Sequence, residues 1–133
     1  MRLKTWPLVS FALLLALAAA TAHATTPAAQ LARFSAEAGR AGDAAQGQRL
    51  FTTRQGGEWS CASCHHAQPT KPGRHAATGK TIDTLAPAFN PASFTDEARV
   101  NKWFRRNCKE VLSRECSAAE KADITAWLIT LKP

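Results

Sequence analysis

The sequence lacks an apolar run long enough to span a membrane. Its longest apolar stretch, Leu8–Ala20, has about a dozen residues, whereas a transmembrane helix needs roughly 20. Two basic residues precede this stretch, and Ala22-His23-Ala24 after it has the small-x-small pattern typical of a cleavage site. We therefore expect residues 1–24 to be a cleaved signal peptide that exports one domain, residues 25–133, to the periplasm.

Sustained alternation of apolar and polar residues is also absent, so no segment is predicted to be a β-strand. Four helical patterns are present instead, beginning near Leu31, at Asp43, at Thr95 as the expected N-cap, and at Ser117, which opens a capping box with Glu120. Residues 67–92 are rich in proline and glycine and are expected to form a loop. The patterns predict an all-α fold of about four helices.

The second of these helices is expected to stop around Gly56-Gly57 and to cross the last helix closely. Gly47 and Phe51 share one face of it, and Trp127 lies on the apolar stripe of the last helix. A glycine at such a crossing would let the tryptophan ring approach the backbone.

Positive charge exceeds negative charge, but it is scattered along the chain. Arg2 and Lys4 leave with the expected signal peptide, so the net charge would be +5 rather than +7. The basic residues lack the interleaved aromatics of a base-stacking groove, which excludes nucleic acid as a partner. A mildly basic exported domain is suited to an acidic partner or an anionic surface.

Four cysteines occur, and in an oxidising compartment each should be committed to a bond. Cys61, Cys64 and His65 spell C-x-x-C-H, the haem c attachment pattern, with His65 as the proximal iron ligand. A zinc site would need two more ligands at closer spacing than the other cysteines have, and a thioredoxin-like site would need a βαβ context. We therefore predict one covalently bound haem c, with Cys108 and Cys116 joined in a disulfide.

The expected domain has no methionine, the usual second axial ligand in such cytochromes, because Met1 would leave with the signal peptide. Among the other side chains, His66 adjoins His65 and cannot reach the opposite face. His75, in a basic loop, would give bis-His ligation if the loop folded over the haem. Lys80 and Lys102 would each have to lose a proton, which is costly without burial.

Asn107 is the remaining candidate for the sixth position. It follows Val100, Trp103 and Phe104 on the apolar face of the third helix. A core amide without a partner costs about 1–3 kcal/mol. The spacing leaves two interpretations open, a distal iron ligand or a structural asparagine that caps the C-terminus of the helix. The expected disulfide at Cys108 would hold Asn107 in place in either case.

The chain resembles known families at these residues. C-x-x-C-H, the helix with Gly47 and Phe51 before it, and the aromatic residue on the last helix are similar to class I cytochromes c. The stretch from Phe94 to Leu128, with TGK at residues 78–80 and LAP at 85–87, resembles the sphaeroides haem protein family. That resemblance implies a class I cytochrome c fold, oxygen binding, and Asn107 as the labile sixth ligand.

The resemblance also implies electron donors, a dihaem cytochrome c and a membrane cytochrome b. We expect a monomer in which reduction releases Asn107, so that O2 or NO can bind. The alternative is a plain electron carrier with permanent bis-His ligation through His75. Turnover as an oxidase or an NO-detoxifying enzyme is a third possibility, although the sequence names no catalytic residue for it.

Overall fold

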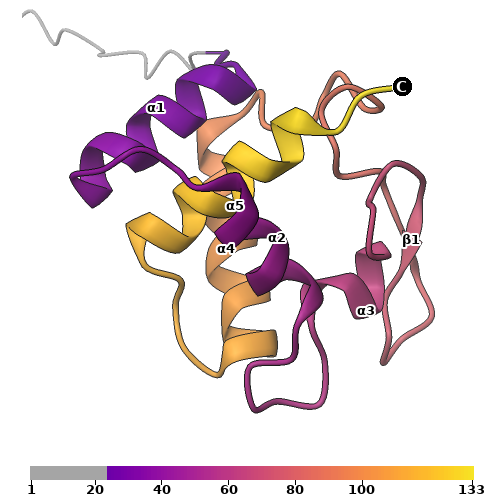
Figure 1. Ribbon diagram of the computed structural model, residues 1–133. Helices are drawn as coiled ribbons and strands as arrows, with labels where there is room; N and C mark the ends of the chain where they lie inside the picture. Colours follow the sequence, from indigo (N-terminus) through magenta and orange to yellow (C-terminus); the bar gives the residue numbers. More distant parts are fainter. Residues whose placement is uncertain (1–23) are drawn as a thin grey trace, which may run out of the picture.

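The computed structural model describes residues 24–133, which form five helices and one short hairpin (Figure 1). The elements are α1 (Pro27–Ala38), α2 (Ala44–Thr52), α3 (Cys61–His65), β1 (Gly73–Arg74), β2 (Thr81–Ile82), α4 (Glu97–Leu112) and α5 (Ala118–Thr130). The all-α prediction is confirmed, and the C-x-x-C-H motif forms a helix, α3, in addition to the four that were predicted. The expected signal peptide lies outside the described residues, except for Ala24.

The hairpin is the one pair of strands in the described part of the chain, and the sequence did not predict it. Gly73 pairs with Ile82 and Arg74 with Thr81 in antiparallel register. Two residues per strand are too few to give a visible alternation, which explains the omission. Figure 1 shows the hairpin beside α3, on the side of the molecule opposite α1.

Helix α5 lies against both α1 and α2, and the core forms where they meet. The rings of Phe51 and Trp127 are 4.9 Å apart, which confirms the expected crossing of α2 and α5. The glycine acts differently from the expectation, because a Cβ at Gly47 would collide with the backbone carbonyl of Asp123. Gly47 therefore lets two backbones approach each other, rather than a ring and a backbone.

Helix ends differ in places from the sequence predictions. Helix α2 ends at Thr52, before the expected glycines. Asp96, not Thr95, is the N-cap of α4, since its side chain accepts a hydrogen bond from the Arg99 N–H at 2.8 Å. The capping box of Ser117 and Glu120 at the start of α5 is confirmed.

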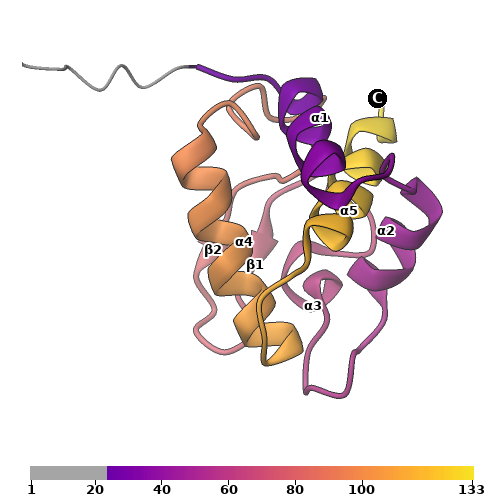
Figure 2. The ribbon, with the colours of Figure 1, turned by 90° about the vertical axis from the view of Figure 1, so that its left-hand side faces the viewer.

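Helix α4 runs along one edge of the molecule in Figure 2 and continues to Leu112. Ser113, with a φ of 57°, is its C-cap. Asn107 is therefore inside the helix and cannot be the capping residue, so the structural interpretation of this asparagine is wrong. Among residues 24–133, no helix is long and apolar enough to cross a membrane.

Candidate functional site

A large cavity lies between α3, the hairpin and α4. Its volume is about 1210 Å³, which exceeds the roughly 300–1,000 Å³ of ordinary small-molecule pockets. Core residues from α2 and α5 also line it: Phe51, Ile124 and Leu128. The lining is mostly apolar, which is suited to a large planar cofactor with few polar groups.

Helix α3 carries the three residues of the attachment motif into this cavity, and all three line it. Cys61 and Cys64 are three residues apart and His65 follows four after Cys61, so the three side chains share one helix face. The helix begins where the Ser60 N–H donates to Ser63 Oγ at 3.0 Å. It ends at His66, whose φ of 66° turns the chain away.

Burial shifts the pKa values of Cys61 and His65 on this face of α3. It raises the pKa of the Cys61 thiol to about 11. It also lowers the pKa of His65 to about 4, with smaller contributions from the charges of His66 and His75. The His65 imidazole is therefore neutral at pH 7, and the neutral ring is the form that ligates a metal. The Phe51 ring packs with its centroid 6.1 Å from that of His65.

The Asn107 side chain lines the same cavity from α4. Among residues 24–133, its amide has no hydrogen-bond partner, although the side chain is only partly exposed. The Cys108–Cys116 disulfide is confirmed, with Cα atoms 5.5 Å apart, and it connects the residue after Asn107 to the start of α5. The structure thus presents a restrained amide to the cavity that holds the C-x-x-C-H residues.

The other candidates for the sixth position differ in their surroundings. His66 is exposed, with Nε2 3.1 Å from the Pro72 carbonyl oxygen, and it does not line the cavity. His75 does line it, but both of its nitrogens have partners. Nδ1 accepts from the Thr78 N–H at 3.3 Å, and Nε2 lies 3.1 Å from Glu110 Oε1. Lys80 and Lys102 also lie along the cavity wall.

Glu110 also lines the cavity, although it was not predicted from the sequence. It follows Asn107 by three positions, so it is on nearly the same face of α4, and that spacing was the available signal.

The hairpin forms another wall of the cavity, which the sequence did not predict. The Ala76 N–H lies 3.2 Å from Cys64 Sγ, and a Cβ at Gly73 would collide with the Cys64 carbonyl oxygen. The hairpin therefore packs directly on α3.

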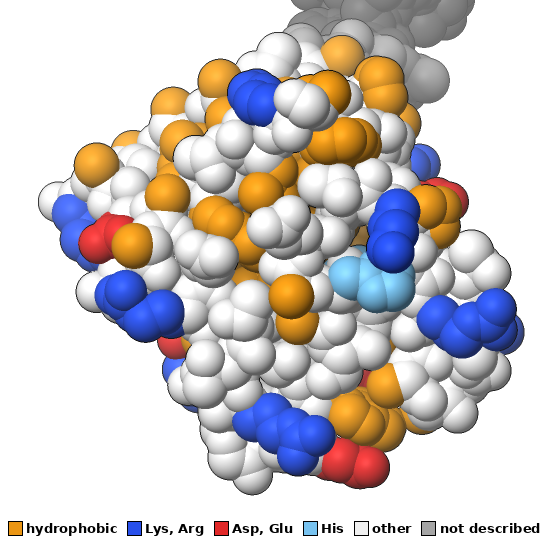
Figure 3. Space-filling model, turned by 45° about the vertical axis from the view of Figure 1, so that its right-hand side comes forward, with side chains coloured by type: hydrophobic (Ala, Val, Ile, Leu, Met, Phe, Trp, Pro, Cys, Tyr) orange, Lys and Arg blue, Asp and Glu red, His pale blue; other side chains and the backbone are white. Residues whose placement is uncertain are grey.

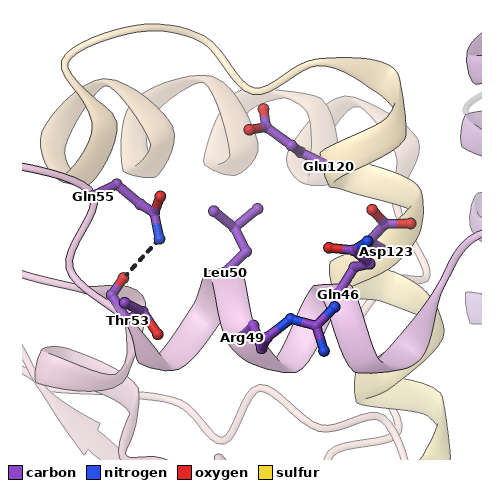
Figure 4. A pocket seen from close by; sticks show the side chains of 7 residues that line it. All are labelled: Gln46, Arg49, Leu50, Thr53, Gln55, Glu120 and Asp123. Carbon is purple, nitrogen blue, oxygen red and sulfur yellow. Dashed lines mark hydrogen bonds between the residues drawn. The ribbon is translucent and has the colours of Figure 1, made fainter.

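A second, smaller hollow of about 330 Å³ lies between α2 and the start of α5 (Figure 4). It is lined by Gln46, Arg49, Leu50, Thr53, Gln55, Glu120 and Asp123. Its two carboxylates are already bound, Glu120 by Arg114 and Asp123 by Arg40. No cysteine or histidine of the described chain lines it, so this hollow lacks the attachment residues.

The residues of the large cavity fit a haem c. Two thiols and a neutral imidazole face a mostly apolar space, and the Asn107 amide, which has no hydrogen-bond partner in the described chain, faces the same space from α4. Cys61 and Cys64 would hold the porphyrin and His65 would ligate its iron.

The sequence comparisons agree with this fit. A protein-family model described as a domain of unknown function (DUF1924) matches residues 33–128. The cytochrome c-type protein SHP of Cereibacter sphaeroides is 47% identical over 113 residues, which are 82% of this chain and 87% of that protein. Cytochrome c'' of Methylophilus methylotrophus is 43% identical over 82 residues, 62% of this chain and 57% of that protein.

Two solved structures are similar as well. Oxidised SHP, described as an oxygen-binding cytochrome c, has a TM-score of 0.76 and 45% identity, covering 81% of this chain and 99% of that one. Oxidised cytochrome c'' from Methylophilus methylotrophus has a TM-score of 0.70 and 32% identity, covering 80% and 95%. The chain therefore belongs to the family of the cytochrome c-type protein SHP, a family of cytochromes whose cofactor is one covalently bound haem c.

Proposed function

We propose that this protein is an exported cytochrome that binds a small diatomic ligand, O2 or NO, in its reduced state. Its similarity to SHP supports this, because the SHP structure is that of an oxygen-binding cytochrome c and the chain covers 99% of it. The haem supplies an iron centre that changes valence and accepts axial ligands.

In this proposal, Cys61 and Cys64 form the two thioether bonds and His65 is the proximal ligand. The burial that lowers the pKa of His65 to about 4 keeps its imidazole neutral and available as a ligand at physiological pH. The Phe51 ring beside it limits the orientations of the imidazole. These three residues are assigned on the C-x-x-C-H pattern and their shared face of α3.

Asn107 is the proposed distal ligand, and one observation carries this assignment. Its amide lines the same cavity as the attachment residues, from another helix, and has no hydrogen-bond partner among residues 24–133. An amide oxygen is a hard, weak base, which ferric iron accepts more readily than ferrous iron does. Reduction should therefore release Asn107 and open the sixth position. Haem-ligand detachment is described for the related cytochrome c'' of Methylophilus methylotrophus, which supports a labile ligand in this fold.

We further propose that the electrons come from a dihaem cytochrome c, supplied in turn by a membrane cytochrome b. A periplasmic location, reached through the signal peptide at residues 1–24, would bring the protein to such donors. The competing proposal of a plain carrier ligated by His75 requires the imidazole to leave Glu110. Such a carrier would not bind external ligands in either valence state.

Substitution of Asn107 tests the assignment. Asn107→Ala removes the amide oxygen but leaves the helix intact, because alanine is the best helix former. We expect its ferric absorption spectrum to change from low spin to high spin or water-ligated, while His75→Ala, the matched control, retains the wild-type spectrum. An unaltered ferric spectrum in Asn107→Ala would exclude this residue as the ligand.

A further inference from the structure

Helix α4 carries an unusual concentration of positive charge. Five of the 15 lysines and arginines in residues 25–133 lie within its last fourteen positions, and all five side chains are exposed: Arg99, Lys102, Arg105, Arg106 and Lys109. We call these five residues the α4 basic face. In contrast, Lys and Arg side chains on the molecular face in Figure 3 are separated from one another.

Most of these charges have no acidic partner among residues 24–133. Lys109 lies 3.6 Å from Glu115, and both side chains are more than half exposed, so that ion pair adds little stability. The other four make no ion pair and donate no side-chain hydrogen bond within the described chain. Elsewhere, Arg40 and Arg114 each bind a carboxylate at 2.7–2.8 Å. Lys102 and Arg106 lie 5.9 and 5.1 Å from the centroid of the Trp103 ring, a contact within the same helix. The charges of the α4 basic face therefore make no strong ion pair with another element of the described chain.

The α4 basic face lies beside the proposed haem cavity. Helix α4 also carries Asn107 and forms one wall of the cavity. Arg99, Lys102 and Arg106 reach the cavity wall, whereas Arg105 and Lys109 do not line it. The two propionates of a haem can neutralise at most two of the three cations on the wall. The positive charge that points away from the cavity remains available to a partner.

We infer that the α4 basic face is the docking surface for an acidic electron-transfer protein that reduces this cytochrome. The inference rests on the proposed function, because it identifies where the electron donor binds. An acidic donor complements the charge of the face, and such complementarity raises association rates by about 10–10³. A membrane is the weaker alternative, because insertion needs a continuous apolar stripe. Trp103 is the one large apolar side chain of α4 that is exposed in the described chain, and Lys102 and Arg106 lie over its ring.

The test is the rate at which reduced dihaem cytochrome c from the same organism reduces the ferric protein, measured by stopped flow. Arg105→Glu with Lys109→Glu reverses two charges that do not line the cavity. Arg49→Glu with Lys132→Glu makes the same change in net charge elsewhere. Arg49 lies on α2, as Figure 4 shows, and neither control side chain has an ion pair within residues 24–133. Arg105→Glu alone serves as the milder variant.

We expect the α4 pair to lower the second-order rate constant at least ~10-fold at about 0.02 M salt. The loss should disappear near 0.5 M salt, where the Debye length is only roughly 4 Å. The control pair should change the rate less than ~2-fold. Equal losses in the two pairs, or no loss in the α4 pair, would overturn the inference.

Two further readouts separate this inference from the proposed function. Binding to phosphatidylglycerol vesicles that is lost in the α4 pair, with unchanged reduction by the cytochrome, would show that the face meets a membrane and would overturn the inference. CO binding after reduction by dithionite reports on the haem alone. Normal CO binding together with slow reduction by the partner supports docking at α4, while absent CO binding in the wild type refutes the proposed function whatever the docking result.

Discussion

His75 Nε2 lies 3.1 Å from Glu110 Oε1, so the turn of the hairpin is joined to α4 three residues beyond Asn107. The next residue of the turn, Ala76, lies against Cys64 Sγ through its N–H. The hairpin thus contacts both the attachment helix and the helix of the proposed distal ligand. Because Nδ1 of His75 accepts from the Thr78 N–H, Nε2 is the nitrogen that donates to Glu110.

This arrangement predicts the behaviour of a His75 variant. His75→Ala should leave the ferric and ferrous spectra of the haem essentially unchanged, because both ring nitrogens already have protein partners. It should lower the stability by about 0.5–1.5 kcal/mol through loss of the contact with Glu110. Absorption spectra and thermal unfolding of the holoprotein would measure both effects. A high-spin ferric spectrum in His75→Ala would instead favour bis-His ligation and the electron-carrier alternative.

The disulfide is predicted to matter for ligation as well as for stability. Replacing both Cys108 and Cys116 by serine opens a short loop and should cost about 2.5 kcal/mol in the chain-entropy model. It should also loosen the end of α4 and produce a mixture of low-spin and high-spin ferric haem. Urea unfolding and electron paramagnetic resonance would measure the two effects. A fully low-spin spectrum in the double variant would show that Asn107 needs no such restraint.

The buried carboxylate of Asp123 predicts a specific pH dependence of stability. Asp123 accepts two hydrogen bonds from Arg40 and one from the Asp43 N–H. The Arg40 hydrogen bond is the main reason that its pKa is lowered in the folded state. A carboxyl group with a depressed folded pKa stabilises the fold above its unfolded pKa, near 3.9, and loses this effect as the pH falls through its folded pKa.

Asp123→Asn should therefore lower the unfolding free energy by about 1–3 kcal/mol at pH 7. The deficit should remain nearly constant down to about pH 4 and shrink below it, where the wild-type carboxylate becomes protonated. Urea denaturation from pH 7 to pH 2 would follow this. Asp83→Asn, at an exposed position with no ion pair among residues 24–133, is the control. A deficit independent of pH would show that packing, not charge, explains the effect.

Short-range signals in the sequence predicted much of the fold and the site. C-x-x-C-H is local, so it indicated the attachment residues, and the capping box at Ser117 located the start of α5. The apolar spacing of α4 indicated that Asn107 lies on the apolar face of that helix. The sequence left open whether Asn107 capped the helix, because the end of α4 depends on the left-handed conformation of Ser113, a residue without a strong preference for it.

Features that depend on contacts between residues far apart in the sequence were not predicted. The pairing of Gly73 with Ile82 involves strands too short for a periodic signal. The partner of His75 is 35 positions away on another element, and no local pattern relates them. The role of Gly47 was predicted in part, because spacing indicated a close crossing but could not show that it meets the α5 backbone rather than the ring of Trp127.

The most direct test of the central claim is the visible spectrum of the purified wild-type protein before and after reduction, with and without CO. If Asn107 binds only the oxidised iron, the ferric protein is low spin, the ferrous protein shows a high-spin band, and CO shifts that band. A sharp low-spin α band in the ferrous protein that CO does not change would contradict the account.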